Sequence, residues 1–229
     1  MKPLLLLDAY LDPRGGAASF LPRFQGRPVL VLRPAHGHEL PADPRAFAAI
    51  VMNGSAASWA DGVPWGAPLL GLLRRCAALG VPYLGVCFGH QALGAAFGEG
   101  VRKATTPEVG WKDVAVHVTD DPLLGPHAPG FVQFLSHEDE VVPTDVGLDR
   151  LASTSLCPMA AVKVRGAPMW GVQFHAELGL DEARQLLAYR ARRHPELGLD
   201  VETEARRAAH ATDLADDLIA RFLERVPVG

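Results

Sequence analysis

Gly85-Val86-Cys87-Phe88-Gly89-His90-Gln91 is the stretch of sequence that best indicates how this chain folds. It follows a short apolar run at residues 81–84 and precedes an Ala-, Leu- and Phe-rich segment at residues 92–97, so it predicts a strand, a sharp turn and a helix. Glycines two residues before and two residues after Cys87 leave room at the tip of a strained turn, as a nucleophile elbow requires. The pattern therefore predicts a nucleophile at Cys87.

A cysteine at this place is suited to nucleophilic attack. The free N–H groups and the dipole at the start of the following helix favour a negative charge, and therefore the thiolate of Cys87. The N–H of Phe88 would point to the same position and could donate to an oxyanion. The alternative is a buried cysteine that only lets the helix pack closely, and the turn alone does not decide between the two.

A base for this thiol follows a second apolar run. Residues 169–174 read Met-Trp-Gly-Val-Gln-Phe and lead into His175-Ala176-Glu177, 88 residues after Cys87. Because residues two apart in an extended chain face the same way, His175 could act as the base while Glu177 orients its imidazole. A surface His beside a surface Glu is the alternative. The catalytic interpretation is favoured because both candidates follow strands at the edge where a parallel sheet gathers its active site.

Together, residues 85–91 and 171–177 resemble the class I glutamine amidotransferase family. The resemblance implies hydrolysis of the side-chain amide of glutamine through a Cys87, His175 and Glu177 triad, with the ammonia usually passed to a synthase. Weaker family landmarks extend the resemblance over most of residues 1–190: Val51-Met52-Asn53-Gly54-Ser55, Gly110-Trp111 and Leu135-Ser136-His137-Glu138-Asp139.

These landmarks imply further site residues. The resemblance assigns the second oxyanion N–H to Gly54, beside that of Phe88, and places Gln91, Ser136 and His137 around the bound substrate. Two positions depart from the family pattern: Asn53-Gly54-Ser55 stands where Gly-Gly-Pro is frequent, and Ala176 stands where proline is frequent. Gly54 is kept, and a proline would act through backbone stiffness rather than chemistry, so the same chemistry is expected.

Composition bounds the class of protein. At 229 residues and 48% hydrophobic residues, the chain can bury a substantial core. The formal net charge of −4 gives no basic excess for nucleic acid or an anionic membrane, so neither partner is expected. The apolar run at residues 4–7 is too short for a signal peptide or a membrane span, which predicts a cytoplasmic protein.

The cysteines and histidines suggest neither a disulfide framework nor a cofactor site. Cys76, Cys87 and Cys157 are an odd number at unrelated spacings; Cys76 is expected in the core, and Cys157 is expected to have a structural role. His36 and His38 invite a zinc interpretation, but no recognised ligand motif supports it, so they are expected in surface loops. We therefore expect no metal and no cofactor.

The order of apolar runs predicts an α/β fold. Short apolar runs at residues 4–7, 29–32 and 50–52 are typical of buried parallel strands, and residues 64–80 carry a helical pattern. The expected architecture is a doubly wound, mostly parallel, flavodoxin-like open sheet flanked by helices. Three later strand-like segments predict a smaller mixed or antiparallel extension of this sheet, at residues 114–118, 131–135 and 160–164.

The C-terminal segment is predicted to be helical. Residues 181–192 form one expected helix, His194-Pro195 breaks it, and residues 201–225 form a second, with Asp200 or Thr203 as its N-cap. The expected organisation is an amidotransferase domain at residues 1–193, followed by a helical appendage at residues 194–229 that packs on the same domain.

Three functions stay open. The sequence has no second catalytic segment and no Gly-rich phosphate loop, so a glutaminase is expected to release ammonia to an acceptor synthase on a separate chain. Residues 135–141 are similar to GMP synthetase glutaminase domains and favour this interpretation. The alternative is a γ-glutamyl peptidase acting on γ-glutamyl compounds such as glutathione. A non-catalytic regulatory module is a third possibility, against which the complete set of triad residues argues.

Overall fold

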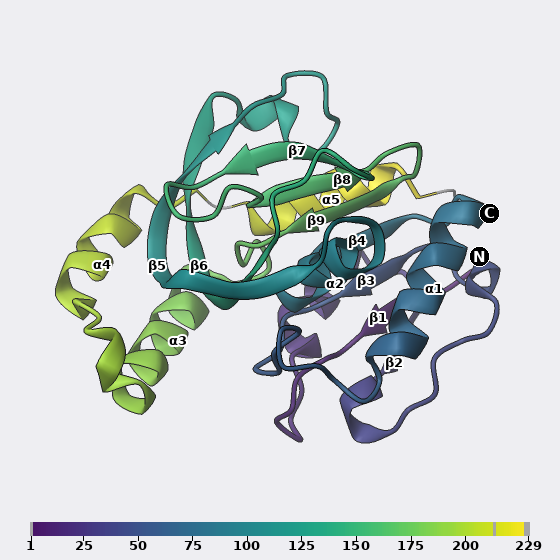
Figure 1. The fold of residues 1–229 in the computed structure, drawn as a ribbon, viewed down its shortest axis with the longest axis horizontal. Helices are drawn as coiled ribbons and strands as arrows, with labels where there is room; N and C mark the ends of the chain where they lie inside the picture. Colours follow the sequence, from purple (N-terminus) through teal and green to yellow (C-terminus); the bar gives the residue numbers. More distant parts are fainter. Residues whose placement is uncertain (1, 213, 227–229) are drawn as a thin grey trace.

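One sheet organises the molecule. The computed structural model describes residues 2–212 and 214–226, and in them nine strands pair in the order β2-β1-β3-β4-β9-β8-β7-β5-β6 (Figure 1). One half of the sheet is parallel, and its strands confirm the apolar runs read from the sequence: β2 (Val29–Leu32), β1 (Leu4–Leu7), β3 (Ile50–Met52), β4 (Tyr83–Val86) and β9 (Met169–Val172).

The other half of the sheet is antiparallel. It consists of β8 (Ala161–Val164), β7 (Leu148–Ser153), β5 (Val101–Val116) and β6 (Gly130–Val141). The expected extension is confirmed, but β5 and β6 form a ribbon much longer than the predicted segments, and β7 was not predicted. The first half of β5 includes Arg102, Lys103, Thr105 and Thr106, whose polar side chains hide the strand from a hydrophobicity pattern.

Two layers cover the parallel strands because alternate residues of each strand face opposite ways. On β1, Leu5 and Leu7 pack in a core cluster with α1 (Gly66–Leu79) and α2 (Phe88–Phe97). Leu4 and Leu6 pack in another cluster with Phe20, Phe24 and α5 (Ala215–Glu224). The α/β class with helices flanking the sheet is thus confirmed, and the carboxyl ends of β3, β4 and β9 are left to form a site.

The C-terminal segment differs from the prediction. Helix α3 (Leu180–Arg193) and the cap of α4 (Val201–Arg207) are as expected, since Asp200 Oδ1 accepts a hydrogen bond from Thr203 N at 3.0 Å. The prediction of a single helix over residues 201–225 is wrong. The helix is broken after α4 by a turn at Ala208–His210, and Thr212 N donates to Val132 O of β6 at 2.9 Å. That bond holds the chain against the ribbon before α5 begins. No helix within residues 2–212 and 214–226 has both the length and the apolar character needed to cross a membrane.

Candidate active site

Cys87 occupies a strained turn between β4 and α2. Its φ of 52° and ψ of −102° lie in a region that non-glycine residues rarely adopt. A Cβ at Gly85 would lie 2.3 Å from Gly89 O, and a Cβ at Gly89 would lie 2.6 Å from Met52 O, so both positions require glycine. The turn is held by Cys87 N, which donates to Val172 O at 2.8 Å. The predicted strand, turn and helix are confirmed.

His175 and Glu177 meet Cys87 at this turn. His175 Nδ1 lies 2.8 Å from Glu177 Oε1, and both side chains are buried. Because a carboxylate accepts, Nδ1 carries the proton and Nε2 is left for the cysteine. Both side chains lie against Gly54. A Cβ added to Gly54 would be 3.2 Å from His175 Cε1 and 3.8 Å from Cys87 Sγ. The sulfur and the imidazole are therefore neighbours, although 88 residues separate them in the sequence.

The electrostatics of His175 suit a proton donor. Burial acts to lower its pKa, but the Glu177 carboxylate and the Cys87 thiolate more than offset this, so the pKa of His175 lies well above its usual value. The raised pKa of His175 favours the protonated imidazole in the neutral range. An imidazolium next to a thiolate is the charge distribution that a cysteine nucleophile uses.

The loop after β3 brings the Gly54 backbone to the same point. Asn53 anchors this loop, since its Oδ1 accepts from Ala9 N at 2.7 Å and its Nδ2 donates to Asp8 Oδ1 at 2.8 Å. Within the described part of the chain, no protein acceptor is bonded to the N–H of Gly54 or of Phe88. Both N–H groups therefore remain available to a developing oxyanion.

A cavity of about 220 Å³ opens beside Cys87. Its walls include Ser55, Gln91, Ser136 and His137, and charged side chains of both signs also line it: Asp61, Lys103, Glu138, Asp139 and Arg190. Lys103 Nζ lies 3.0 Å from Asp61 Oδ2 and 3.1 Å from Asp139 Oδ1, and Arg190 pairs with Glu138. Glu138 and Asp139 belong to the landmark at residues 135–139, whereas sequence reasoning missed Asp61, Lys103 and Arg190, because nothing in the local pattern sets these three apart from an ordinary solvated surface.

The three predicted substrate-binding residues all line this cavity, but their side chains are engaged differently. Gln91 Nε2 donates to Asp139 O at 2.8 Å and contacts Gln173 Oε1 at 3.2 Å, which leaves its own oxygen for a substrate. Ser136 O lies 4.0 Å from Cys87 Sγ. Both ring nitrogens of His137 have protein partners, so a role of this imidazole in substrate binding stays a prediction.

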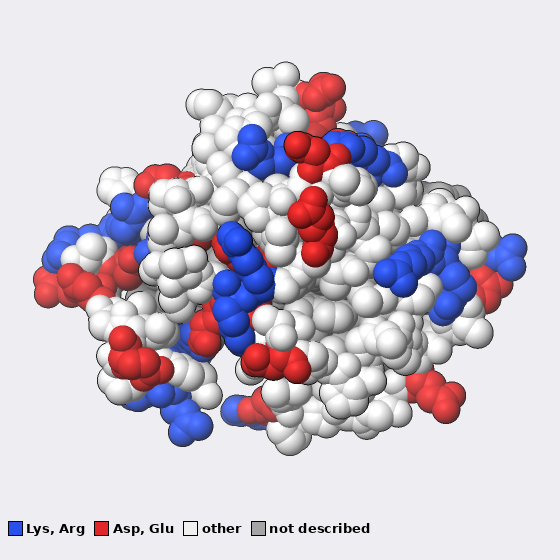
Figure 2. Space-filling view, in the orientation of Figure 1, with Lys and Arg blue, Asp and Glu red and all other residues white. Residues whose placement is uncertain are grey.

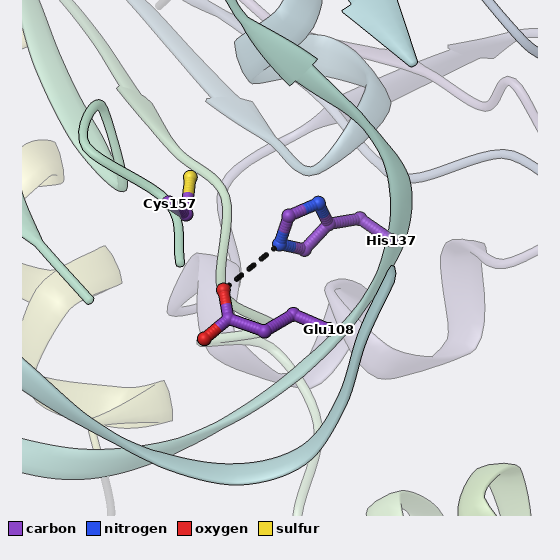
Figure 3. Close-up of side chains that lie close together, drawn as sticks. All are labelled: Glu108, His137 and Cys157. Carbon is purple, nitrogen blue, oxygen red and sulfur yellow. Dashed lines mark hydrogen bonds and ion pairs between the residues drawn. The ribbon is translucent and has the colours of Figure 1, made fainter. Parts of the chain in front are cut away.

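A second Cys, His and Glu set lies close to the first. Glu108, His137 and Cys157 have ligand atoms within 4.8 Å of one another, and His137 Nε2 lies 3.3 Å from Glu108 Oε2 (Figure 3). Glu108 was not singled out in the sequence, and only the register of β5 and β6, which pairs it with His137, brings the two together. Cys157 is fully buried and does not line the cavity, and burial raises the pKa of its thiol. Of these two cysteines, Cys87 is the one that lines the cavity.

The surface charges are mixed. Figure 2 shows acidic and basic side chains interspersed over the face seen in Figure 1, with large uncharged areas between them. On this face, the charged residues form small groups of both signs.

Comparison with known proteins agrees with this geometry. The profile of the family described as glutamine amidotransferase class-I matches residues 43–191. A glutamine-hydrolysing GMP synthase of Porphyromonas gingivalis is 31% identical over 141 residues, which are 62% of this chain and 27% of that protein. A glutamine-hydrolysing GMP synthase subunit of Sulfolobus acidocaldarius is 39% identical over 101 residues, 44% of this chain and 53% of that protein. The chain thus spans between about a quarter and about half of the length of these two relatives.

Solved structures share the fold over the whole chain. A glutamine amidotransferase of Methylobacillus flagellatus has a TM-score of 0.81 at 23% identity, covering 99% of this chain and 96% of that one. A glutamine amidotransferase of Thermotoga maritima has the same TM-score at 17% identity, covering 99% and 98%. Since the family profile matches more than half of the chain, over a range that includes both Cys87 and His175, this chain belongs to the class-I glutamine amidotransferase family.

Proposed function

We propose that this protein hydrolyses the side-chain amide of L-glutamine through a thioester on Cys87. One observation carries the proposal: the strained turn places Cys87 in the wall of a cavity and next to the His175 and Glu177 pair. The family supplies the reaction class, and the position of the two side chains supplies the nucleophile and the acid.

The proposed reaction has two steps. The Cys87 thiolate attacks the carboxamide carbon, and the N–H groups of Gly54 and Phe88 stabilise the resulting oxyanion. His175 then gives its proton to the nitrogen, the C–N bond breaks, and ammonia leaves a γ-glutamyl thioester. A water molecule, deprotonated by His175, attacks the thioester and releases glutamate and the free thiol. Glu177 holds the imidazole in the required tautomer throughout.

The charged wall of the cavity suits the amino-acid end of glutamine. That end carries one carboxylate and one ammonium group, and the wall offers Lys103 and Arg190 for the first and Asp139 and Glu138 for the second. Because these side chains are paired with one another, a zwitterion can replace the existing ion pairs without leaving a charge unpaired. Gln91 and Ser136 would contact the same part of the substrate.

The ammonia is proposed to go to a synthase on another chain. The support is the similarity to proteins described as subunits of a glutamine-hydrolysing GMP synthase. Turnover of glutamine is expected to rise when the correct synthase and its other substrates are added. An unchanged rate across candidate synthases would contradict this part of the proposal.

A γ-glutamyl peptidase is the second candidate function, and one observation favours it. A second cavity of about 590 Å³ adjoins the first and shares Ala57, Ser58 and Asp61 with it. Its walls include apolar side chains from Leu11, Val63 and Trp65. A leaving group larger than ammonia, such as the remainder of a γ-glutamyl peptide, would have room there.

The test compares the two substrate classes directly. Purified protein is incubated with glutamine or with glutathione, and ammonia, glutamate and cysteinylglycine are measured separately. Ammonia and glutamate in equal amounts support the glutaminase, whereas release of the dipeptide supports the peptidase. Cys87→Ser is expected to abolish either activity, and Cys76→Ser, which changes a buried cysteine on α1, is expected to retain it. Full turnover by Cys87→Ser would overturn both proposals.

A further inference from the structure

Glu108, His137 and Cys157 form a buried cluster beside the active-site cavity, here called the Glu108 cluster. Glu108 comes from β5, His137 from β6 and Cys157 from the loop between β7 and β8. Figure 3 shows that the imidazole and the carboxylate contact each other and that the cysteine lies nearby. We propose that the Glu108 cluster binds one divalent metal ion of the zinc type through the Glu108 carboxylate, His137 Nε2 and Cys157 Sγ.

The first support is the orientation of the imidazole. His137 Nδ1 lies 2.9 Å from Asp139 O, and because a carbonyl oxygen only accepts, Nδ1 carries the proton. In the neutral ring, Nε2 then directs a lone pair towards Glu108 Oε2, 3.3 Å away. A metal ion between these two atoms could accept both lone pairs. Metal-binding histidines usually donate their other ring N–H in this way, which fixes the tautomer.

The contact between His137 and Glu108 is also long for a direct ion pair. A charged N–H···O⁻ hydrogen bond is ordinarily about 2.7–2.9 Å. At 3.3 Å, the two atoms are close to the separation of roughly 3–4 Å that ligands have around a tetrahedral zinc ion. The ligand atoms of the cluster all lie within 4.8 Å of one another, so binding requires contraction of any pair by no more than about an ångström.

The second support is an unpartnered oxygen on Glu108. The side chain is 1% exposed, Oε2 accepts from Thr154 Oγ1 at 2.8 Å, and Oε1 has no hydrogen-bond partner among the described residues. A buried carboxylate oxygen without a partner is costly, and a cation held by both oxygens of the carboxylate would satisfy it.

The loop that carries Cys157 is already shaped around this carboxylate. Thr154 Oγ1 accepts from Cys157 N at 2.8 Å, so its own proton points to Glu108, and the same threonine holds both the cysteine and the carboxylate in place. The mix of sulfur, nitrogen and oxygen ligands selects zinc-type ions, because calcium and magnesium prefer oxygen ligands alone.

Metal binding would tie three parts of the antiparallel half together behind the active-site cavity. His137 belongs to the cluster and also lines that cavity, next to Ser136, whose carbonyl oxygen lies 4.0 Å from Cys87 Sγ. The ion would therefore brace the cavity wall without touching the proposed nucleophile.

The experiment measures metal binding without using catalysis. All variants carry Cys87→Ser, because the catalytic cysteine and His175 could bind zinc themselves. Chelator-stripped protein is titrated with Zn²⁺ while the melting temperature is followed, and with Co²⁺ while the thiolate-to-cobalt absorption is followed. We expect one ion per chain, a higher melting temperature and a thiolate band.

Matched variants locate the site. Cys76→Ser changes another buried cysteine and is expected to leave binding intact, whereas Cys157→Ser is expected to abolish the thiolate band. The affinity of the Cys157→Ser protein for the metal ion should fall by more than the roughly 10- to 100-fold loss that is typical when a residue outside the ligand set is changed. If Cys157→Ser does not fold, Glu108→Gln, which keeps the shape of the side chain, replaces it. Absence of metal binding in the Cys87→Ser protein would overturn the proposal. So would metal binding that is unchanged by Cys157→Ser or by Glu108→Gln.

Discussion

At the scale of single residues, the molecule contains two cysteines with an adjacent histidine and glutamate in very different surroundings. Cys87 has a positive φ, lines a cavity and lies beside a buried imidazole whose pKa is raised. Cys157 is fully buried and has its backbone N–H bonded to Thr154. The same three residue types therefore suit nucleophilic chemistry in one place and ion binding in the other, because the strain and exposure of the cysteine differ.

Glu177→Gln tests the proton balance of the proposed triad. In the native protein, turnover should stay high through neutral pH and fall at alkaline pH, because His175 then loses the proton that it gives to ammonia. The Glu177 carboxylate raises the pKa of His175, and burial lowers it. Without the carboxylate, the pKa of His175 falls, so the alkaline limb of the profile moves to lower pH. We expect kcat to fall by about 10²- to 10⁴-fold.

The measurement is a pH–rate profile of glutamine hydrolysis for Glu177→Gln beside Glu182→Gln. Glu182 accepts a hydrogen bond from Ser19 at 2.8 Å and lies outside the proposed triad, so its profile should match that of the native protein. An alkaline limb that does not move in Glu177→Gln would show that this carboxylate does not set the protonation of His175.

At the scale of elements, the turn between β4 and α2 depends on close approach of two backbones. Gly89→Ala would place a Cβ 2.6 Å from Met52 O of β3, where neither backbone can move independently. We expect a loss of stability of about 1–3 kcal/mol, typical of overpacking, and lower turnover because α2 shifts together with Cys87. Urea unfolding measures the first effect.

Gly71→Ala is the matched control, because it adds the same methyl group on α1 with only the flexible end of Arg75 at 3.4 Å. Its stability should rise by roughly 0.5–1 kcal/mol, since alanine favours a helix more than glycine does. Equal stability changes in the two variants would contradict the packing argument.

Helix α4 is attached to the β5–β6 ribbon by Arg207, whose Nε donates to Trp111 O at 2.7 Å, and by the carboxylate of Glu204. Glu204 Oε2 accepts from Trp111 N at 2.7 Å, and its Oε1 lies 2.6 Å from Lys112 Nζ. Glu204→Ala leaves a buried N–H without its partner, which costs about 1–3 kcal/mol. The melting temperature should fall, whereas Glu202→Ala, which removes an exposed pair with Arg206, should change it little. Similar melting temperatures for both variants would rule out this role for Glu204.

At the scale of the whole molecule, the last helix belongs to the central core. Leu218 and Phe222 of α5 are buried with Leu4 and Leu6 of β1, although the segments lie at opposite ends of the sequence. We propose that residues 194–229 are an appendage that does not unfold separately from residues 1–193. If α5 unfolded alone, the face of the sheet that it covers would expose its apolar side chains to water.

Phe222→Ala tests this coupling. The ring is fully buried against Trp170, with centroids 6.3 Å apart, and its loss should cost about 3–5 kcal/mol. We expect calorimetry to show one transition for the native protein and one transition at a lower temperature for Phe222→Ala. Two separate transitions, only one of which moves, would show that the appendage is an independent unit.

The sequence by itself determined the features that depend on neighbouring residues. The turn at Cys87 could be predicted because two glycines at fixed spacing meet a local steric requirement, and strands β1 and β3 because unbroken apolar runs are typical of strands buried on both faces. Strand β2 was also predicted, but it lies at the edge of the sheet and is only partly buried. His175 and Glu177 could be paired because they lie two positions apart along the chain, with only Ala176 between them.

Only the tertiary structure decided the features that depend on strand order and register. β9 lies next to β4, and this pairing brings His175 to Cys87. The register of β5 and β6 places Glu108 opposite His137, and a loop between two further strands adds Cys157. The break after α4 has the same origin, because a bond from Thr212 to β6 overrides the helical preference of the segment. Local preferences amount to fractions of a kcal/mol per residue, so contacts between distant segments outweigh them.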